Sequence, residues 1–167
     1  MGNRQGPVVL SLSWHTGAAL PLSRRFATNG GQMPDRQAVF PAGRHALYAQ
    51  HGYSAAIRSG DLLFVSGQVG TRTDGSRVED LEGEITQAFE NLRAVLAAAG
   101  CTLDDIVDVT TFHVDPEAQF ETVMAVKPKY FPGPEYPNWT AVGVTWLAGF
   151  RFEIKAIARI PEQVNHD

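Results

Sequence analysis

The sequence predicts an α+β fold with a single sheet and two helices on one face. Five segments carry β-branched and apolar residues in the alternating or continuous patterns of strands, and two longer segments repeat apolar residues every three or four positions, as helices do. Their order along the chain is strand, strand, helix, strand, helix, strand, strand. Two helices can cover only one face of a sheet, which favours this architecture over a doubly wound one.

Composition limits the class of protein. The chain has 167 residues, of which 44% are hydrophobic and 19% charged, a net charge of -4 and one cysteine. These values fit one globular core without a disulfide framework. The acidic balance lacks the basic surface that binding of nucleic acid or of an anionic membrane needs. No stretch reaches the roughly 20 apolar residues of a membrane span. We therefore expect a cytoplasmic protein with no nucleic-acid or membrane partner.

The chain divides into three parts. Residues 1–43 form an N-terminal arm of uncertain status, rich in turn residues, for which Met33 is an alternative start. Residues 44–161 form the folded domain, and residues 162–167 form a short tail. The regular patterns of apolar residues begin after Tyr53.

The first half of the domain predicts a hairpin and a long helix. A short strand over Ala55–Arg58 and a longer one over Leu62–Gln68 flank the turn residues Ser59, Gly60 and Asp61. A helix then opens at Asp80 or Glu82 and ends at Gly100, where glycine suits the position after the last helical residue.

The second half predicts a strand, a helix and two further strands. Ile106–Val114 is a strand, and Asp115 with Pro116 starts the second helix, whose expected core positions are Phe120, Val123, Met124 and Tyr130. Pro128 lacks an amide donor and should end or kink this helix near Lys127. The last strands cover Thr140–Thr145 and Phe150–Ile160.

Two of the strands are too apolar for a sheet covered on one side only. Leu62–Val65 and Ala141–Val144 carry apolar residues or glycine at both alternating positions. Another copy of the chain is the simplest cover for the second face. The sequence therefore predicts a homo-oligomer.

Familiar catalytic motifs are absent from the sequence. The five histidines show no metal-ligand spacing with cysteine or with each other, so we expect no metal site. There is no phosphate-binding loop and no Gly-x-Ser-x-Gly motif, and we expect no cofactor. His113 lies on a strand, but no partner is evident for it.

Six segments, in this order and spacing, resemble the Rid (reactive intermediate deaminase) family, also called YjgF or L-PSP. The segments are Tyr53–Ala56, Leu62–Gln68, Gln87–Leu92, Asp105–Phe112, Tyr130–Phe131 and Glu153–Ala158. The resemblance implies a chorismate-mutase-like fold and a homotrimer with small-molecule clefts between subunits. It also implies a hydrolase or deaminase reaction, in which water adds to the C=N carbon of an enamine or imine and the adduct releases ammonia.

The resemblance also implies site residues. Glu153 corresponds to the glutamate that orients water and acts as catalytic acid and base, Ser66 to a hydroxyl and amide donor, and Tyr53 to a tyrosine of the cleft, while Gly67 keeps the cleft floor open. Deaminating members carry an arginine after a Pro-x pair, where this chain has Trp139. Burying a substrate carboxylate without a cation is costly, so we expect a substrate other than the usual small imino acid. Trp139 would then be a flat wall of the pocket.

Other interpretations stay open at this point. Glu153 fits a surface carboxylate paired with Arg151 or Lys155. Arg151, Lys155 or Lys127 could replace the missing arginine. A non-catalytic trimer that binds a small metabolite or a partner in the same clefts is the alternative function.

Overall fold

The computed structural model describes residues 36–42 and 46–162. Within these ranges six strands form one sheet in the order β1-β2-β3-β6-β4-β5. The strands are β1 (Arg36–Val39), β2 (Ala56–Ser59), β3 (Leu62–Val69), β4 (Ile106–His113), β5 (Asn138–Gly143) and β6 (Phe152–Arg159), and the helices are α1 (Ala46–His51), α2 (Leu81–Ala98) and α3 (Pro116–Tyr130).

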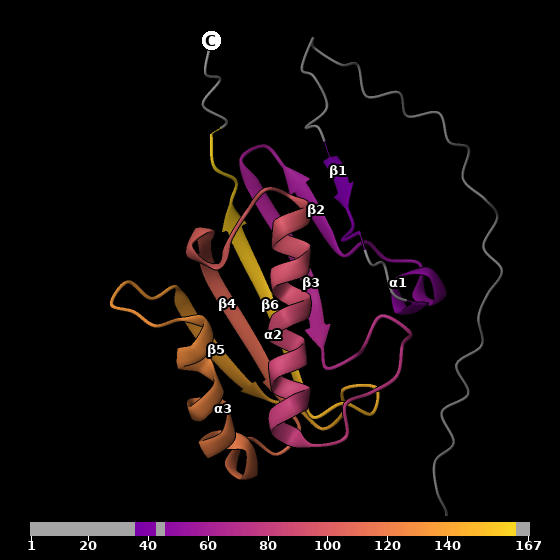
Figure 1. Ribbon diagram of the computed structural model, residues 1–167, viewed down its shortest axis with the longest axis vertical. Coiled ribbons are helices and arrows are strands. Elements are labelled where there is room, and N and C mark those ends of the chain that lie inside the picture. Colours follow the sequence, from indigo (N-terminus) through magenta and orange to yellow (C-terminus); the bar gives the residue numbers. More distant parts are fainter. Residues whose placement is uncertain (1–35, 43–45, 163–167) are drawn as a thin grey trace, which may run out of the picture. The chain divides into compact units, whose positions relative to one another are not determined.

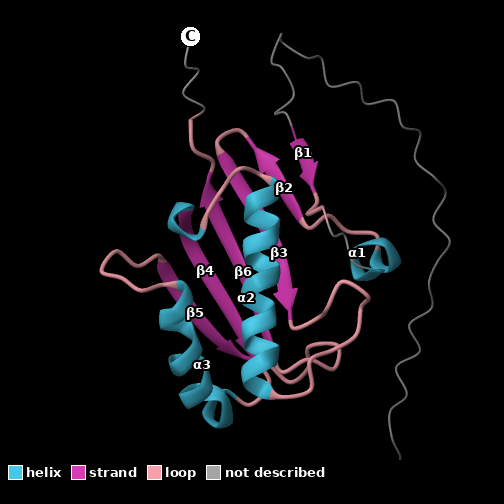
Figure 2. Cartoon of the chain, viewed as in Figure 1, coloured by secondary structure: helices cyan, strands magenta, loops and turns pink. Residues whose placement is uncertain are grey.

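The long helices α2 and α3 lie side by side on one face of the sheet (Figures 1 and 2). The expected α+β arrangement is thereby confirmed. The sequence did not predict β1 and α1. β1 falls within the residues expected to form the arm and pairs with β2 at the edge of the sheet. Four residues are too short a segment to give a readable alternation.

Helix α2 follows the predicted pattern. Asp80 caps it by accepting a hydrogen bond from the Gly83 amide at 2.6 Å, and residues such as Ile85, Phe89 and Leu92 are buried against the sheet. The core lies between the helices and the sheet, and it is built from α2, α3 and the facing side chains of β3, β4 and β6.

Helix α3 differs from the prediction in two respects. It continues through Pro128 to Tyr130, because Phe131 donates to the Lys127 carbonyl at 3.0 Å and the Tyr130 ring stacks on Phe89 at 4.6 Å. These contacts hold the last turn although proline removes one amide donor.

The expected core face of α3 was also partly wrong. Phe120 and Met124 are 64% and 49% exposed, whereas Gln119, Val123 and Val126 are buried. The polar Gln119 occupies a core position. The face that α3 turns toward the core therefore differs from the face that its hydrophobic residues suggest.

The sheet has a second face, here called the open face, on the side opposite α2 and α3. Along β6, Phe152, Ile154 and Ala156 are buried toward the helices, so Glu153 and Lys155 point to the open face. Phe64 of β3, which pairs with Ile157 of β6, is 40% exposed there. None of the described helices is long and apolar enough to cross a membrane.

Candidate functional site

A cavity of about 360 Å³ opens beside the start of strand β6 and is lined by three of the predicted site residues. Its lining consists of His51, Tyr53, Gly67, Val69, Trp146, Leu147, Ala148, Phe150 and Glu153. Tyr53, Gly67 and Glu153 therefore lie together, as the family resemblance implies. Ser66 and Trp139 are not part of this lining.

Glu153 approaches the neighbouring strand at a β-bulge. Ser66 and Gly67 of β3 stand opposite the single residue Lys155 of β6, since Val65 pairs with Ala156 and Gln68 with Ile154. A Cβ atom on Gly67 would overlap the Glu153 carboxylate. Glycine at this position is what allows the carboxylate to lie against the bulge.

The Glu153 carboxylate has no partner among the described side chains or amides, since no hydrogen bond or ion pair joins it to them. Burial raises the pKa of this carboxyl group, and the charge of Lys155 offsets part of the shift. A half-buried, unpaired carboxyl group with a raised pKa can both take up and release a proton.

Tyr53 enters the cavity from the end of α1. The Tyr48 side chain of α1 is buried, donates to the Gln68 side-chain oxygen at 2.7 Å, and meets the Tyr53 ring edge-on at 5.3 Å. Burial and the nearby charge of Glu153 raise the pKa of the Tyr53 phenol. The phenol therefore stays protonated and can donate a hydrogen bond beside the carboxylate.

Ser66 uses both of its donors within the chain. Its amide donates to the Ala55 carbonyl at 2.9 Å and its hydroxyl to the Ser54 carbonyl at 2.7 Å. These bonds tie the bulge to the segment that precedes β2. In this arrangement Ser66 holds the bulge in place, and neither donor points to the cavity.

The loop before β6 supplies an aromatic wall that the sequence reasoning missed. Trp146, at 74% exposure, and Phe150 both line the cavity. Phe150 donates to the Leu147 carbonyl at 2.9 Å, and Arg77 bonds the Gly149 carbonyl and lies over the Phe150 ring at 5.5 Å. The sequence did contain a pattern that could have indicated this wall: two aromatic residues flank an Ala-Gly pair directly before the strand that carries Glu153.

Trp139 lies on the other side of the sheet, with the helices. Its indole N–H donates to the Thr111 hydroxyl at 3.2 Å, its ring meets Phe131 at 5.3 Å, and the Lys127 ammonium lies 3.8 Å from the ring centre. Within one chain, the structure thus does not bring Trp139 to Glu153. It also places Lys127 on the helix side, and burial lowers the pKa of this amine.

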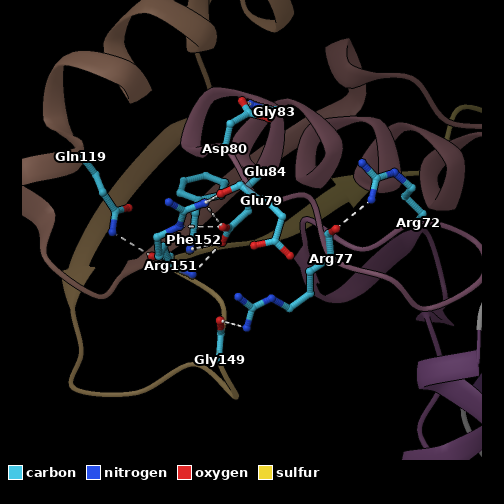
Figure 3. A network of polar contacts seen from close by, with 10 residues as sticks. All are labelled: Arg72, Arg77, Glu79, Asp80, Gly83, Glu84, Gln119, Gly149, Arg151 and Phe152. Atoms are coloured by element: carbon cyan, nitrogen blue, oxygen red, sulfur yellow. Dashed lines mark hydrogen bonds and ion pairs between the residues drawn. The ribbon is translucent and has the colours of Figure 1, made fainter.

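Arg151 binds a buried carboxylate on α2 (Figure 3). Its side chain contacts Glu84, which is 1% exposed, at 2.7 and 2.8 Å, and also donates to the Glu79 carbonyl at 2.7 Å. The Arg151 and Phe152 amides donate to the same carboxylate at 2.6 and 3.2 Å. Neither a pairing of Arg151 with Glu153 nor a free Arg151 guanidinium is found.

His113, for which the sequence offered no partner, belongs to a buried chain of hydrogen bonds. Its ring nitrogens lie 2.9 Å from the Thr111 hydroxyl and 3.4 Å from the Gln119 side-chain oxygen, and Gln119 donates to the Arg151 carbonyl at 3.0 Å. Burial lowers the pKa of His113, against the effect of the Gln119 hydrogen bond. The imidazole is therefore neutral and supports the fold. No group of three or more potential metal ligands is present in the described ranges.

Comparisons with known proteins place the chain among related sequences. The family model described as Endoribonuclease L-PSP matches residues 43–160. The chain is 71% identical over 131 residues to the RutC family protein YjgH of Escherichia coli, covering 78% of this chain and all of that protein. It is 37% identical over 111 residues to the 2-iminobutanoate/2-iminopropanoate deaminase of Mus musculus, covering 64% of this chain and 79% of the mouse protein.

A solved structure shares the fold. The structure of protein YJGH is 72% identical in sequence and superposes with a TM-score of 0.74 over 77% of this chain and 98% of that one. The family model covers well over half of the chain, and the segments that suggested the resemblance lie inside the matched range. This chain therefore belongs to the Endoribonuclease L-PSP family, the family also called Rid or YjgF.

Proposed function

We propose that the chain is a Rid-type hydrolase that deaminates an enamine or imine, with Glu153 as its catalytic acid and base. Family membership and relatives named as deaminases support a Rid-type function in general terms. The observation that carries the specific proposal is the half-buried Glu153 carboxyl, which has a raised pKa and faces the cavity beside Gly67 and Tyr53.

The chemistry needs few groups. Glu153 takes a proton from water while the water oxygen bonds to the C=N carbon, and it returns this proton to the nitrogen, which gives a carbinolamine. It then takes the proton of the new hydroxyl group and passes it to the amino group, so that the C–N bond breaks, ammonia leaves and a carbonyl compound remains. The Tyr53 phenol donates a hydrogen bond within the cavity and orients the substrate. Ser66 acts indirectly by holding the bulge on which Gly67 lies.

The substrate is proposed to differ from the usual small imino acid. The position of the expected arginine is occupied by Trp139, on the helix side of the sheet. Arg151 and Lys127, two of the three candidate replacements, are engaged elsewhere. Lys155 points to the open face beside Glu153 but does not line the cavity.

We further propose a homotrimer in the cytoplasm, with small-molecule clefts between subunits. The exposed Phe64 and Val142 on β3 and β5 support an interface, because apolar side chains on a sheet face favour cover by a second copy. RNA cleavage is not proposed, since a net charge of -4 disfavours attraction of a polyanion.

Replacing the carboxylate tests the catalytic role. Glu153→Gln keeps the size of the side chain but removes its acid-base function, so we expect hydrolysis of enamine and imine substrates to fall by about 10²-fold or more. Ammonia release is measured with imines generated in situ. Glu121→Gln, an exposed carboxylate on α3, is the matched control and should retain full activity.

Unchanged activity in Glu153→Gln would remove the assigned role. The alternative of a non-catalytic, metabolite-binding trimer draws on one observation, the lack of Lys or Arg in the described cavity lining. A broad screen of imines without turnover, together with a ligand that raises the melting temperature, would favour it.

A further inference from the structure

The buried Glu84 carboxylate of α2 accepts its hydrogen bonds from Arg151 and Phe152, the two residues directly before Glu153. One oxygen, Oε1, accepts from the backbone amides of Arg151 and Phe152 at 2.6 and 3.2 Å. The other, Oε2, contacts the Arg151 guanidinium at 2.7 and 2.8 Å (Figure 3). Glu84 therefore binds the backbone at the start of β6 with one oxygen and a side chain with the other.

The backbone of Arg151 is bonded on its other side as well. Its carbonyl accepts from the Val114 amide at 2.9 Å and from the Gln119 side chain at 3.0 Å. The donors come from α3 and from the residue after β4, while the acceptor Glu84 comes from α2. Contacts from three elements therefore fix the point at which the chain enters β6.

Glu84 also lies against the end of β3, the strand that carries Gly67. A Cβ atom on Gly70, the residue after this strand, would overlap the Glu84 backbone, so only glycine fits here. The preceding residue, Val69, pairs with Glu153. Glu84 thus contacts both strands of the bulge at the end where they pair at Glu153, and it lies outside the described lining of the cavity.

The position of the Glu153 side chain depends on the backbone just before it. Successive side chains of a strand point to opposite faces, so Phe152 faces the helices and Glu153 the cavity. A shift of the Phe152 amide would move the Glu153 carboxyl relative to Gly67, against which it is closely packed. Misplacing a catalytic group by about 1 Å can lower the rate about 100-fold.

We propose that Glu84 is a positioning residue for the reaction at Glu153, and that it acts through the two backbone amides it binds. The inference rests on the proposed function and adds a residue to its machinery. Glu84 touches no substrate, because its effect passes through the backbone of β6. The ion pair with Arg151 stabilises the fold, and the amide bonds hold the catalytic carboxyl in place.

Two conservative variants separate the amide bonds from the ion pair. Glu84→Gln keeps an oxygen at the same reach for both amides but loses the charge that pairs with Arg151. Glu84→Asp keeps the charge but is one methylene shorter. The long Arg151 side chain can follow the shortened carboxylate by rotation about its own bonds, whereas the amides of a strand cannot.

The amide bonds therefore predict that the glutamine variant is the more active one. We expect Glu84→Gln to retain at least about a third of the wild-type kcat and Glu84→Asp to lose about tenfold or more, with KM within about threefold in both. Ammonia release measures both constants, with imines generated in situ from phenylalanine and from benzylamine. Glu84→Asp as active as Glu84→Gln, or more active, would assign Glu84 to the ion pair alone and overturn the inference.

Two further variants serve as control and as second test. Glu82→Asp alters an exposed glutamate in the same helical turn, paired with Lys129 at 2.9 Å, and should retain full activity. Arg151→Met removes the guanidinium but keeps both amides bonded to Glu84, and it decides the question if Glu84→Asp does not fold. A kcat within about threefold of the wild type supports the inference, and a loss of about tenfold overturns it.

A measurement without turnover tests the position of the carboxyl directly. The pH titration of Glu153 is followed by NMR in protein labelled with ¹³C at its glutamate carboxyl groups, and Glu153→Gln assigns the signal. The titratable groups that face Glu153, namely Tyr53, His51 and Lys155, are the same in all variants. The raised pKa should persist in Glu84→Gln and return toward 4.5 in Glu84→Asp, because a displaced carboxyl is less buried.

The two measurements separate this inference from the proposed function. Identical Glu153 titrations in the wild type and both Glu84 variants would overturn the inference. Different titrations without any hydrolysis by the wild type would support the positioning of Glu153 by Glu84 and contradict the hydrolase. Glu153-dependent hydrolysis with equal kcat in the two Glu84 variants would support the hydrolase and contradict the positioning role.

Discussion

A functional carboxylate that lacks a protein partner costs stability. Burial raises the Glu153 pKa above its ordinary value of 4.5, so the folded chain holds this proton more tightly than the unfolded chain. Protonated Glu153 therefore contributes its full stabilisation of the fold at pH values below the ordinary pKa. This contribution is lost as the pH rises through the raised pKa of the folded chain. At neutral pH, Glu153 therefore destabilises the fold.

Glu153→Gln should accordingly be more stable than the wild type at pH 7, while losing activity. The advantage should shrink as pH falls toward 4, where the wild-type carboxyl is protonated in both states. Melting temperatures between pH 4 and pH 8 measure this difference, with Glu121→Gln as the control for an exposed carboxylate. A variant less stable than the wild type at pH 7 would contradict the argument.

The sequence predicted which residues meet at the site only for residues that belong to a family motif. Tyr53, Gly67 and Glu153 come from family segments and line one cavity. Trp146 and Phe150 come from a loop whose conformation depends on a positive φ at Ala148 and on a contact with Arg77, 69 or more positions earlier in the chain. Such long-range contacts leave no local pattern of residues.

At the level of elements, a buried ion pair joins the start of α2 to the start of β6. Arg151 is partly exposed, but Glu84 is almost completely buried and accepts from two amides as well. Removing one partner of a buried pair leaves an uncompensated charge, which is far more costly than losing an exposed pair. The pair therefore holds β6, and with it Glu153, in register with the helix.

Arg151→Met should lower the free energy of unfolding by about 3 kcal/mol, since the Glu84 carboxylate loses its counter-charge. Arg159→Met removes the exposed pair with Asp61, at 2.6 Å, and should cost less than about 1 kcal/mol. Urea unfolding measures both variants. Equal losses in the two would show that burial does not set the strength of the Arg151 pair.

The two long helices illustrate what a pattern of residues can predict. In α2 every buried large residue is apolar apart from Glu84, so the spacing gave the correct face. In α3 the buried Gln119 bonds His113 and the Arg151 carbonyl, while the apolar Phe120 and Met124 face outward. Hydrophobicity alone cannot identify a core position that is filled for its hydrogen bonds.

For the whole molecule, the proposed trimer makes the open face of the sheet an interface. Phe64→Asp would bury a charge in that interface, so we expect dissociation to monomers with little loss of monomer secondary structure. Phe120→Asp alters a more exposed ring on the helix side and should leave the assembly intact. Light scattering coupled to size-exclusion chromatography gives the mass. A monomeric wild type, or trimeric Phe64→Asp, would contradict this interface.

The packing of Trp139 also limits how the chain could return to the chemistry of its arginine-containing relatives. An arginine at position 139 would be placed beside the Lys127 ammonium, between Thr111 and Phe131, where a second cation is repelled and its charge is partly desolvated. The Lys127 ammonium therefore opposes a carboxylate clamp at position 139. A single Trp139→Arg substitution is therefore expected to place two cations side by side without forming a carboxylate clamp.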